Sequence, residues 1–181
     1  MQSAQAALER LCAPEAEVSV HYLIDLGGDV IQLVEEAQRA WHAGAGEWRG
    51  HDDINSRSIG IELDNRGNHP FPEPQMMALE ELMHGIMARW DIPASGVIGH
   101  SDMAPGRKFD PGPHFDWARL ERQGLAAHPQ RYDAGDAEAF VAAAQRAGFT
   151  AEADFDALLH STRLRRAPWR RGPLGSDDFI L

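Results

Sequence analysis

The densest group of reactive side chains in the sequence lies in residues 99–113. His100 stands ten residues before Asp110, with Lys108 close to the carboxylate and several prolines and glycines around them. A neutral imidazole and a carboxylate are ligands that zinc accepts, and a catalytic zinc site uses three protein ligands and one open position. A proline-stiffened loop can fold back so that both side chains meet one cation, with the Lys108 ammonium facing a developing oxyanion. The alternative is a surface loop built from common turn residues.

Glu62 is a second candidate, because it lies inside an otherwise apolar segment, residues 58–63. Burying a carboxylate costs free energy unless the group has a partner. Glu62 can therefore serve as a general base for a water that a metal ion activates, with its pKa tuned by burial and by the ion. The alternative is that the side chain points to the solvated face of a strand, which is the more common situation for a single strand glutamate.

Two histidines and a cysteine complete the set of candidates. A histidine in a strand is more often packed and hydrogen-bonded than bound to a metal, and we expect this of His21 and His42. Cys12 is the only cysteine, which excludes an intramolecular disulfide and a cysteine-based zinc knuckle. It lies on a predicted helix without a histidine nearby in sequence, so we expect an inert, buried thiol.

The spacing of apolar and turn residues predicts the elements that must position these side chains. We expect an α/β fold: a mixed β-sheet with flanking helices and a small α-helical C-terminal appendage. The expected strands are residues 18–24 and 30–34 as a hairpin, 58–63, and a short buried strand at 97–99 that opens into a non-helical loop, 101–115. The expected helices are residues 3–12, 75–90, 116–123, 137–147 and 152–162, with another beginning near residue 175.

Composition limits the possible partners. The 181 residues hold 17 Lys and Arg against 28 Asp and Glu, a net charge of −11, which opposes nonspecific binding to nucleic acid or anionic lipid. We expect the arginines near the C-terminus to be solvated or packed against helices. No apolar run approaches the ~18 residues of a membrane span, and no signal peptide is visible, which predicts a cytoplasmic protein for the chain as read. The oligomeric state is left open.

Four segments resemble, in order, motifs of a known enzyme family: residues 18–25, 40–44, 55–62 and 99–113. The family is the zinc-dependent N-acetylmuramoyl-L-alanine amidases of type 2, with the AmpD/AmiD-like branch most similar. The resemblance implies a bound Zn²⁺ and hydrolysis of the amide bond between N-acetylmuramoyl and L-alanine. It also implies peptidoglycan or a muropeptide as the substrate.

The resemblance assigns roles to individual residues. It implies that His100 and Asp110 are zinc ligands, that Glu62 is the catalytic carboxylate, and that Lys108 stabilises the tetrahedral intermediate. The positions that it implies for substrate binding are His21, Trp41, His42, Asn55 and Arg107.

The family's first zinc ligand is a histidine in a motif like His-Tyr-Thr, directly before the helix that here begins in residues 1–4. We therefore expect residues 1–125 to be an N-terminally truncated catalytic domain, with the third ligand upstream. The alternative is a catalytically impaired module that binds muropeptide. A true start upstream would also allow a periplasmic protein or an outer-membrane lipoprotein. Residues 126–181 resemble, weakly, part of a peptidoglycan-binding-like domain.

Overall fold

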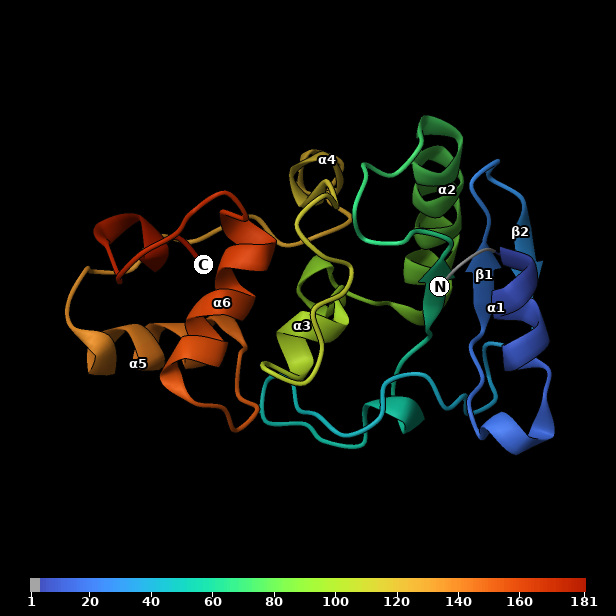
Figure 1. Cartoon of the computed structure of the whole chain (residues 1–181), viewed down its shortest axis with the longest axis horizontal. Helices are drawn as coiled ribbons and strands as arrows, with labels where there is room; N and C mark the ends of the chain where they lie inside the picture. Colours follow the sequence, from blue (N-terminus) through green and yellow to red (C-terminus); the bar gives the residue numbers. More distant parts are fainter. Residues whose placement is uncertain (1–3) are drawn as a thin grey trace. The chain divides into compact units, whose positions relative to one another are not determined.

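The computed structural model describes residues 4–181, and these form two compact units (Figure 1). The first unit comprises the described residues up to Gly44 together with Asp53–Ile92. The second unit comprises Ala45–Asp52 and Pro93–Leu181. The predicted division after residue 125 therefore falls inside the second unit, and its functional meaning stays a prediction.

The first unit contains a small mixed sheet. Its strands are β1 (Tyr22–Ile24), β2 (Val30–Gln32) and β3 (Ile61–Leu63), in the order β2-β1-β3. β2 pairs antiparallel with β1, and β3 pairs parallel with it, so that Leu23 lies opposite Glu62. This confirms the predicted hairpin and the strand around Glu62, although each strand is shorter than the apolar segment that predicted it.

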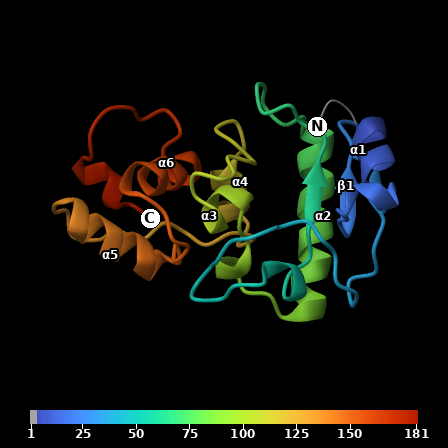
Figure 2. The same cartoon turned by 60° about the horizontal axis from the view of Figure 1, so that its bottom comes forward.

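Helices cover the central strand of this sheet. Figures 1 and 2 show β1 between α1 (Ala4–Leu11) and α2 (Glu73–Trp90), and all three β1 residues are buried. The buried apolar face of α2 has the predicted helical spacing, and fully burying one such side chain stabilises the fold by about 1.5–3 kcal/mol. Its members are Met76, Leu79, Met83 and Ile86. The predicted first residue of α1, Ser3, lies outside the described residues.

A polar cluster fixes the C-terminal end of α2 to the sheet. Glu36 accepts hydrogen bonds from Tyr22 Oη at 2.7 Å, Arg89 Nε at 3.0 Å and Trp90 Nε1 at 2.6 Å. The hydrogen bond from Arg89 is the main reason that the pKa of Glu36 falls from 4.5 to about 2, although burial of the carboxylate opposes the shift. The ionised carboxylate therefore contributes to the stability of this unit.

The second unit contains the remaining helices, α3 (His100–Met103), α4 (Trp117–Arg122), α5 (Ala137–Ala147) and α6 (Phe155–Arg166). Figure 2 shows α5 beside α6, and an apolar core around Phe140, Phe149 and Phe179 lies between them and the C-terminal residues. The helical C-terminal region is thus confirmed. Short 3₁₀ helices occur at Pro14–Ala16, Ile54–Ser56, Ala94–Gly96 and Ser176–Phe179.

Three predicted elements differ from the structure for local reasons. Residues 97–99 form no strand, because the Asp102 carboxylate accepts the Gly99 N–H at 2.8 Å and starts α3 inside the loop that was predicted to be non-helical. The predicted helix 152–162 is Phe155–Arg166, because the Asp154 carboxylate caps it by accepting the Ala157 N–H at 2.7 Å. The helix expected near residue 175 is only the 3₁₀ helix at Ser176–Phe179.

The thiol prediction was also wrong. Cys12 is free and exposed, because it follows the last residue of α1, where the chain turns away from the buried side of that helix.

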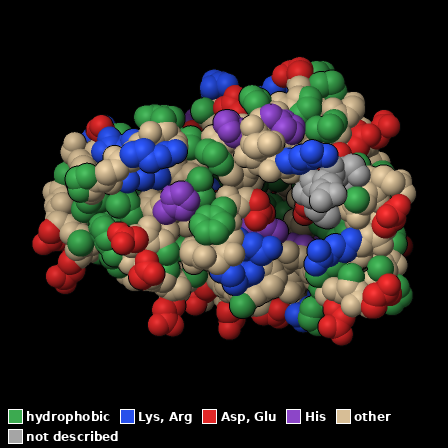
Figure 3. Space-filling view, in the orientation of Figure 1, with side chains coloured by type: hydrophobic (Ala, Val, Ile, Leu, Met, Phe, Trp, Pro, Cys, Tyr) green, Lys and Arg blue, Asp and Glu red, His purple; other side chains and the backbone are tan. Residues whose placement is uncertain are grey.

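The surface carries the expected acidic excess. Figure 3 shows Asp and Glu spread over this face of both units, with Lys and Arg in smaller groups. Among residues 4–181, no helix is long and apolar enough to cross a membrane.

Candidate active site

The loop that follows α3 folds back and brings His100 to Asp110. Nδ1 of His100 hydrogen-bonds Oδ2 of Asp110, and the Ser101 N–H donates to the Asp110 carbonyl at 2.9 Å. The side chains are 22% and 58% exposed, so the pair is open to solvent. The meeting predicted from the proline-rich loop is therefore present, and the second hydrogen bond fixes the two chain segments to each other.

Charges around this pair favour the ionised carboxylate. Desolvation would raise the pKa of Asp110, but the hydrogen bond and charge of His100 outweigh it, and the Lys108 ammonium lowers it further. The net pKa lies below the ordinary value of an aspartate. Lys108 thus acts electrostatically on the carboxylate, while its role at a developing oxyanion stays a prediction.

The donor atoms of this pair suit a zinc ion. An imidazole nitrogen and a carboxylate oxygen lie in direct contact, and both are ordinary zinc ligands. Within residues 4–181, however, no group of three His, Cys, Asp or Glu side chains is placed to hold a metal. Among the described residues, His100 and Asp110 therefore remain the candidate zinc ligands that the sequence suggested.

The backbone beside the pair is closely packed. A Cβ at Gly99 would lie 2.5 Å from Pro111 Cδ and 3.3 Å from a ring atom of Trp117. Only glycine fits between these two rings without a shift of the chain, so Gly99 determines how His100 enters α3. Arg107, farther along the loop, is exposed and donates to the Ala45 carbonyl.

His21, in the first unit, has both ring nitrogens engaged by the backbone. The Gly60 N–H donates to Nδ1 at 3.0 Å, so Nε2 carries the proton and donates to the Gln38 carbonyl at 3.0 Å. The ring is completely buried. This geometry favours the packed alternative for His21 over a role as metal ligand or substrate contact.

His42 lies next to this ring in an edge-on contact, with the ring centroids 5.7 Å apart. It is half-buried, and its Nε2 lies 3.3 Å from Ser58 Oγ. A Cβ at Gly60 would lie 2.5 Å from His42 Cγ, so this glycine lets the imidazole lie directly on the chain that leads into β3.

Asn55 holds the segment that carries His42. Its buried Oδ1 accepts the N–H groups of His42 at 3.0 Å and of Ala43 at 2.8 Å. Asn55 therefore positions the backbone around His42, which is a different task from the substrate contact that the family resemblance implied.

Glu62 and Trp41 are accessible in the first unit. Glu62 is half-buried at the middle of β3. Its side chain is therefore neither fully buried nor fully exposed to solvent, the two situations that the sequence left open. Trp41 is 55% exposed, with the Arg39 guanidinium 4.3 Å from its ring centroid, while Arg39 also pairs with Asp53 at 3.0 Å. An exposed, oriented indole of this kind is a suitable surface for a sugar or an apolar group.

The candidates thus form two groups, one in each unit. In the first unit, His42 contacts the buried His21, Asn55 holds the His42 backbone, and Glu62 lies on β3. Trp41 is exposed on the segment that carries His42. His100, Lys108 and Asp110 come together in the second unit, with Arg107 on the same loop. The sequence interpretation missed Asp102, whose position two residues after His100 on the loop was the only available signal.

The family model of N-acetylmuramoyl-L-alanine amidases matches residues 1–113. The chain is 43% identical over 131 residues to N-acetylmuramoyl-L-alanine amidase AmiD from Escherichia coli, covering 64% of this chain and 48% of the relative. It is 41% identical over 106 residues to 1,6-anhydro-N-acetylmuramyl-L-alanine amidase AmpD from Haemophilus influenzae, covering 58% of each. The chain therefore spans about half the length of these curated relatives.

Solved structures extend the likeness beyond the family model. The E. coli AmiD structure, a complex with the substrate anhydro-N-acetylmuramic acid-L-Ala-D-γ-Glu-L-Lys, matches with a TM-score of 0.88 at 29% identity, covering 98% of this chain and 81% of that one. AmpDh3 from Pseudomonas aeruginosa matches with a TM-score of 0.86 at 28% identity, covering 97% and 84%. From the motifs, the fold and these matches, we conclude that the chain belongs to the N-acetylmuramoyl-L-alanine amidase family.

Proposed function

We propose that the protein hydrolyses the amide bond between N-acetylmuramic acid and L-alanine in a muropeptide or in peptidoglycan. The observation that carries the proposal is the His100–Asp110 pair, which lies in the segment that the amidase family model matches. The likeness to an AmiD structure that holds an anhydro-muropeptide supports the substrate class.

His100 and Asp110 would hold a Zn²⁺ ion in this reaction. In the family that the chain resembles, the third ligand is a histidine in a His-Tyr-Thr-like motif before the first helix. Bound zinc supplies Lewis-acid polarisation of the scissile carbonyl and lowers the pKa of a water toward ~7. The ionised state of Asp110, with a lowered pKa, suits a metal ligand.

Two side chains carry the proton and charge in the proposed reaction. Glu62 takes a proton from the attacking water and delivers it to the leaving nitrogen of L-alanine as the C–N bond breaks. The Lys108 ammonium offsets the negative charge on the carbonyl oxygen, and loss of one such group typically raises the barrier by about 3 kcal/mol. The products are the free lactyl carboxylate and a peptide with an amino terminus.

The accessible groups suit recognition of a muropeptide. The Trp41 indole offers a face for a sugar ring, the His42 imidazole offers a hydrogen-bonding edge, and the Arg107 guanidinium offers a positive charge for a carboxylate. Asn55 contributes by holding the His42 backbone. His21 contributes by supporting Gly60 from inside the unit.

The test is turnover of anhydro-N-acetylmuramic acid-L-Ala-D-γ-Glu-L-Lys by the chain with added Zn²⁺, followed by chromatography of the released tripeptide. We expect release that stops when a chelator removes the metal and returns with Zn²⁺. Absence of release from a metal-loaded form carrying the upstream histidine would refute the amidase proposal.

A second candidate function is binding of a muropeptide without catalysis. Because no third candidate ligand joins His100 and Asp110 among residues 4–181, the chain can act as a muropeptide-binding module. Calorimetry separates the two functions: stoichiometric zinc with turnover excludes the inactive binder, whereas binding of intact muropeptide without release of peptide supports it.

A further inference from the structure

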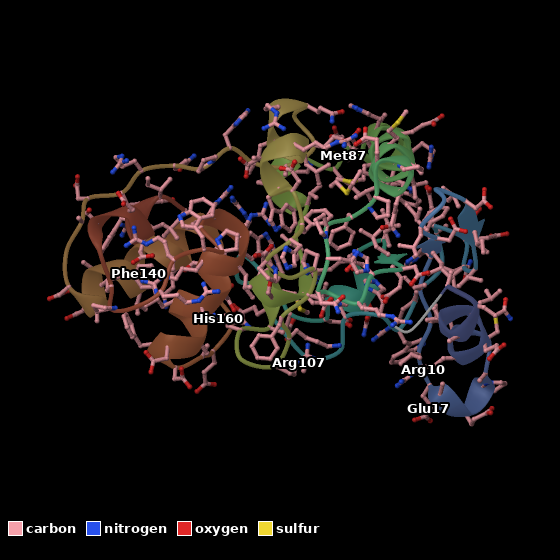
Figure 4. The ribbon with its side chains drawn as sticks, turned by 45° about the horizontal axis from the view of Figure 1, so that its top comes forward. Arg10, Glu17, Met87, Arg107, Phe140 and His160 are labelled. Atoms are coloured by element: carbon pink, nitrogen blue, oxygen red, sulfur yellow. The ribbon has the colours of Figure 1, made fainter. Side chains whose placement is uncertain are left out.

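The loop that carries His100 and Asp110 lies against one side of α6. A Cβ at Gly106 would lie 3.1 Å from Ala157 Cβ, and the rings of Phe109 and His160 meet edge-on with centroids 5.7 Å apart. Figure 4 labels His160 on α6 and Arg107 on the neighbouring loop. The C-terminal helix is thus a direct packing partner of the loop.

The strongest of these contacts is a buried ion pair. Arg165 on α6 donates to Oδ2 of Asp102 in α3, and the two side chains are 3% and 0% exposed. The same guanidinium donates to the Val97 carbonyl at 3.1 Å and lies 3.9 Å from the ring centroid of Trp117. Arg165 therefore contacts α3, the segment that precedes it and the start of α4.

The position of the Asp102 side chain depends on this arginine. Its Oδ2 accepts both Arg165 and the Gly99 N–H, while its buried Oδ1 has no hydrogen-bond partner among residues 4–181. A buried carboxylate that loses its cation is strongly unfavourable, so the Asp102 side chain would have to move. That movement would release the Gly99 N–H, which fixes the residue directly before His100.

We propose that Arg165 is a positioning residue for the His100–Asp110 pair, acting through Asp102, so that the C-terminal helix forms part of the support of the catalytic loop. The inference rests on the proposed function in that it takes this pair as the metal-binding pair. Hydrogen bonds that orient metal ligands typically change metal affinity by about 10- to 100-fold. The Arg165 guanidinium does not contact His100 itself. It acts through Asp102 on the backbone at Gly99, which determines where the His100 imidazole lies.

Arg163 provides a matched control on the same helix. It pairs with the buried Asp178 through two hydrogen bonds of 2.8 Å, and Asp178 also pairs with Arg170. Residues two apart on a helix point about 200° apart. Arg163→Met therefore removes another largely buried arginine that pairs with an aspartate, with side chains 10% and 0% exposed, on the side of α6 away from the loop.

The experiment compares Arg165→Met, Arg165→Lys and Arg163→Met in the full chain. Hydrogen exchange without metal is measured for the amides of Gly99, Ser101, Asp102 and Ala104, followed by Zn²⁺ affinity by chelator competition. We expect Arg165→Met to speed exchange of these amides at least about tenfold and to weaken zinc binding by about 10- to 100-fold. Arg165→Lys should fall between, and Arg163→Met should leave both values unchanged.

Equal exchange in Arg165→Met and Arg163→Met would overturn the proposal. If Arg165→Met does not fold, the double variant Asp102→Ala with Arg165→Met removes the lone buried charge together with the acceptor of the Gly99 N–H, and it is expected to show the same faster exchange. A wild-type chain that binds no zinc would count against the proposed function alone, because the exchange measurement decides the positioning role without metal.

Discussion

The two units use their histidines in opposite ways. In the first unit, His21 is completely buried, and backbone groups engage both of its ring nitrogens. In the second unit, His100 is partly exposed and meets the carboxylate of Asp110 at the surface of a loop. A histidine whose nitrogens are both used by the backbone maintains the fold, whereas one that faces a carboxylate at an open surface can exchange that contact for a metal ion.

The largest expected effect comes from removing the open histidine. His100→Ala should lower the proposed amidase activity and Zn²⁺ affinity by more than roughly 100-fold, because loss of the proposed ligand exceeds the effect of losing a group that orients one. Its free energy of unfolding should change by less than about 1 kcal/mol, because little packing is lost. Peptide release, zinc content and urea unfolding provide the measurements. His114→Ala, an exposed histidine of the same unit, is the control and should alter none of them.

The buried histidine should give the reverse result. His21→Ala leaves the Gly60 N–H and the Gln38 carbonyl without their partners and opens a cavity, which together should cost about 2–4 kcal/mol. Urea unfolding measures this loss, with the exposed His84→Ala as the control. A variant as stable as the wild type would remove the distinction between the two histidines.

Glu36 provides a pH-dependent test of the internal support in the first unit. Its pKa is about 2 in the folded protein and 4.5 without its partners. The unfolded chain therefore binds more protons, so the stabilisation is present above pH 4.5 and is lost as the pH falls toward 2. Glu36→Gln should cost about 1.5–3 kcal/mol near neutral pH and much less at low pH. Urea unfolding at several pH values checks this, and a constant difference would contradict it.

The smallest expected effect concerns the contact between Ser58 and His42. Ser58 Oγ donates to the Ile54 carbonyl at 2.5 Å and lies 3.3 Å from His42 Nε2. Ser58→Ala should cost about 1 kcal/mol and shift the NMR signals of the His42 ring. The exposed Ser56→Ala is the matched control. Unchanged His42 signals would show that the serine does not orient this imidazole.

The fold was predictable where apolar spacing is long and regular. The apolar positions of α2 repeat over 18 residues, and the hairpin has its turn residues between two apolar segments. The strand predicted at residues 97–99 was wrong, because a segment of three residues shows little periodicity. The conformation there is set by the Asp102 carboxylate, which starts α3.

The candidate site was predictable only where its residues lie close together in the sequence. The ten-residue spacing and the prolines of the loop made the meeting of His100 and Asp110 foreseeable. Arg165 stands 63 residues from Asp102, and nothing local marks one aspartate or one arginine as the partner of the other. Contacts of this range depend on tertiary packing, and a single sequence contains no signal for them.

The Arg165–Asp102 contact also has a consequence for the order of synthesis. Asp102 leaves the ribosome 63 residues before the arginine that neutralises it, so its carboxylate must stay hydrated while the chain grows. The loop can therefore reach its final packing only after α6 has been made. Zinc binding at the proposed His100–Asp110 pair would then follow completion of α6, and a nascent chain stopped before Arg165 would present His100 without the backbone that orients it.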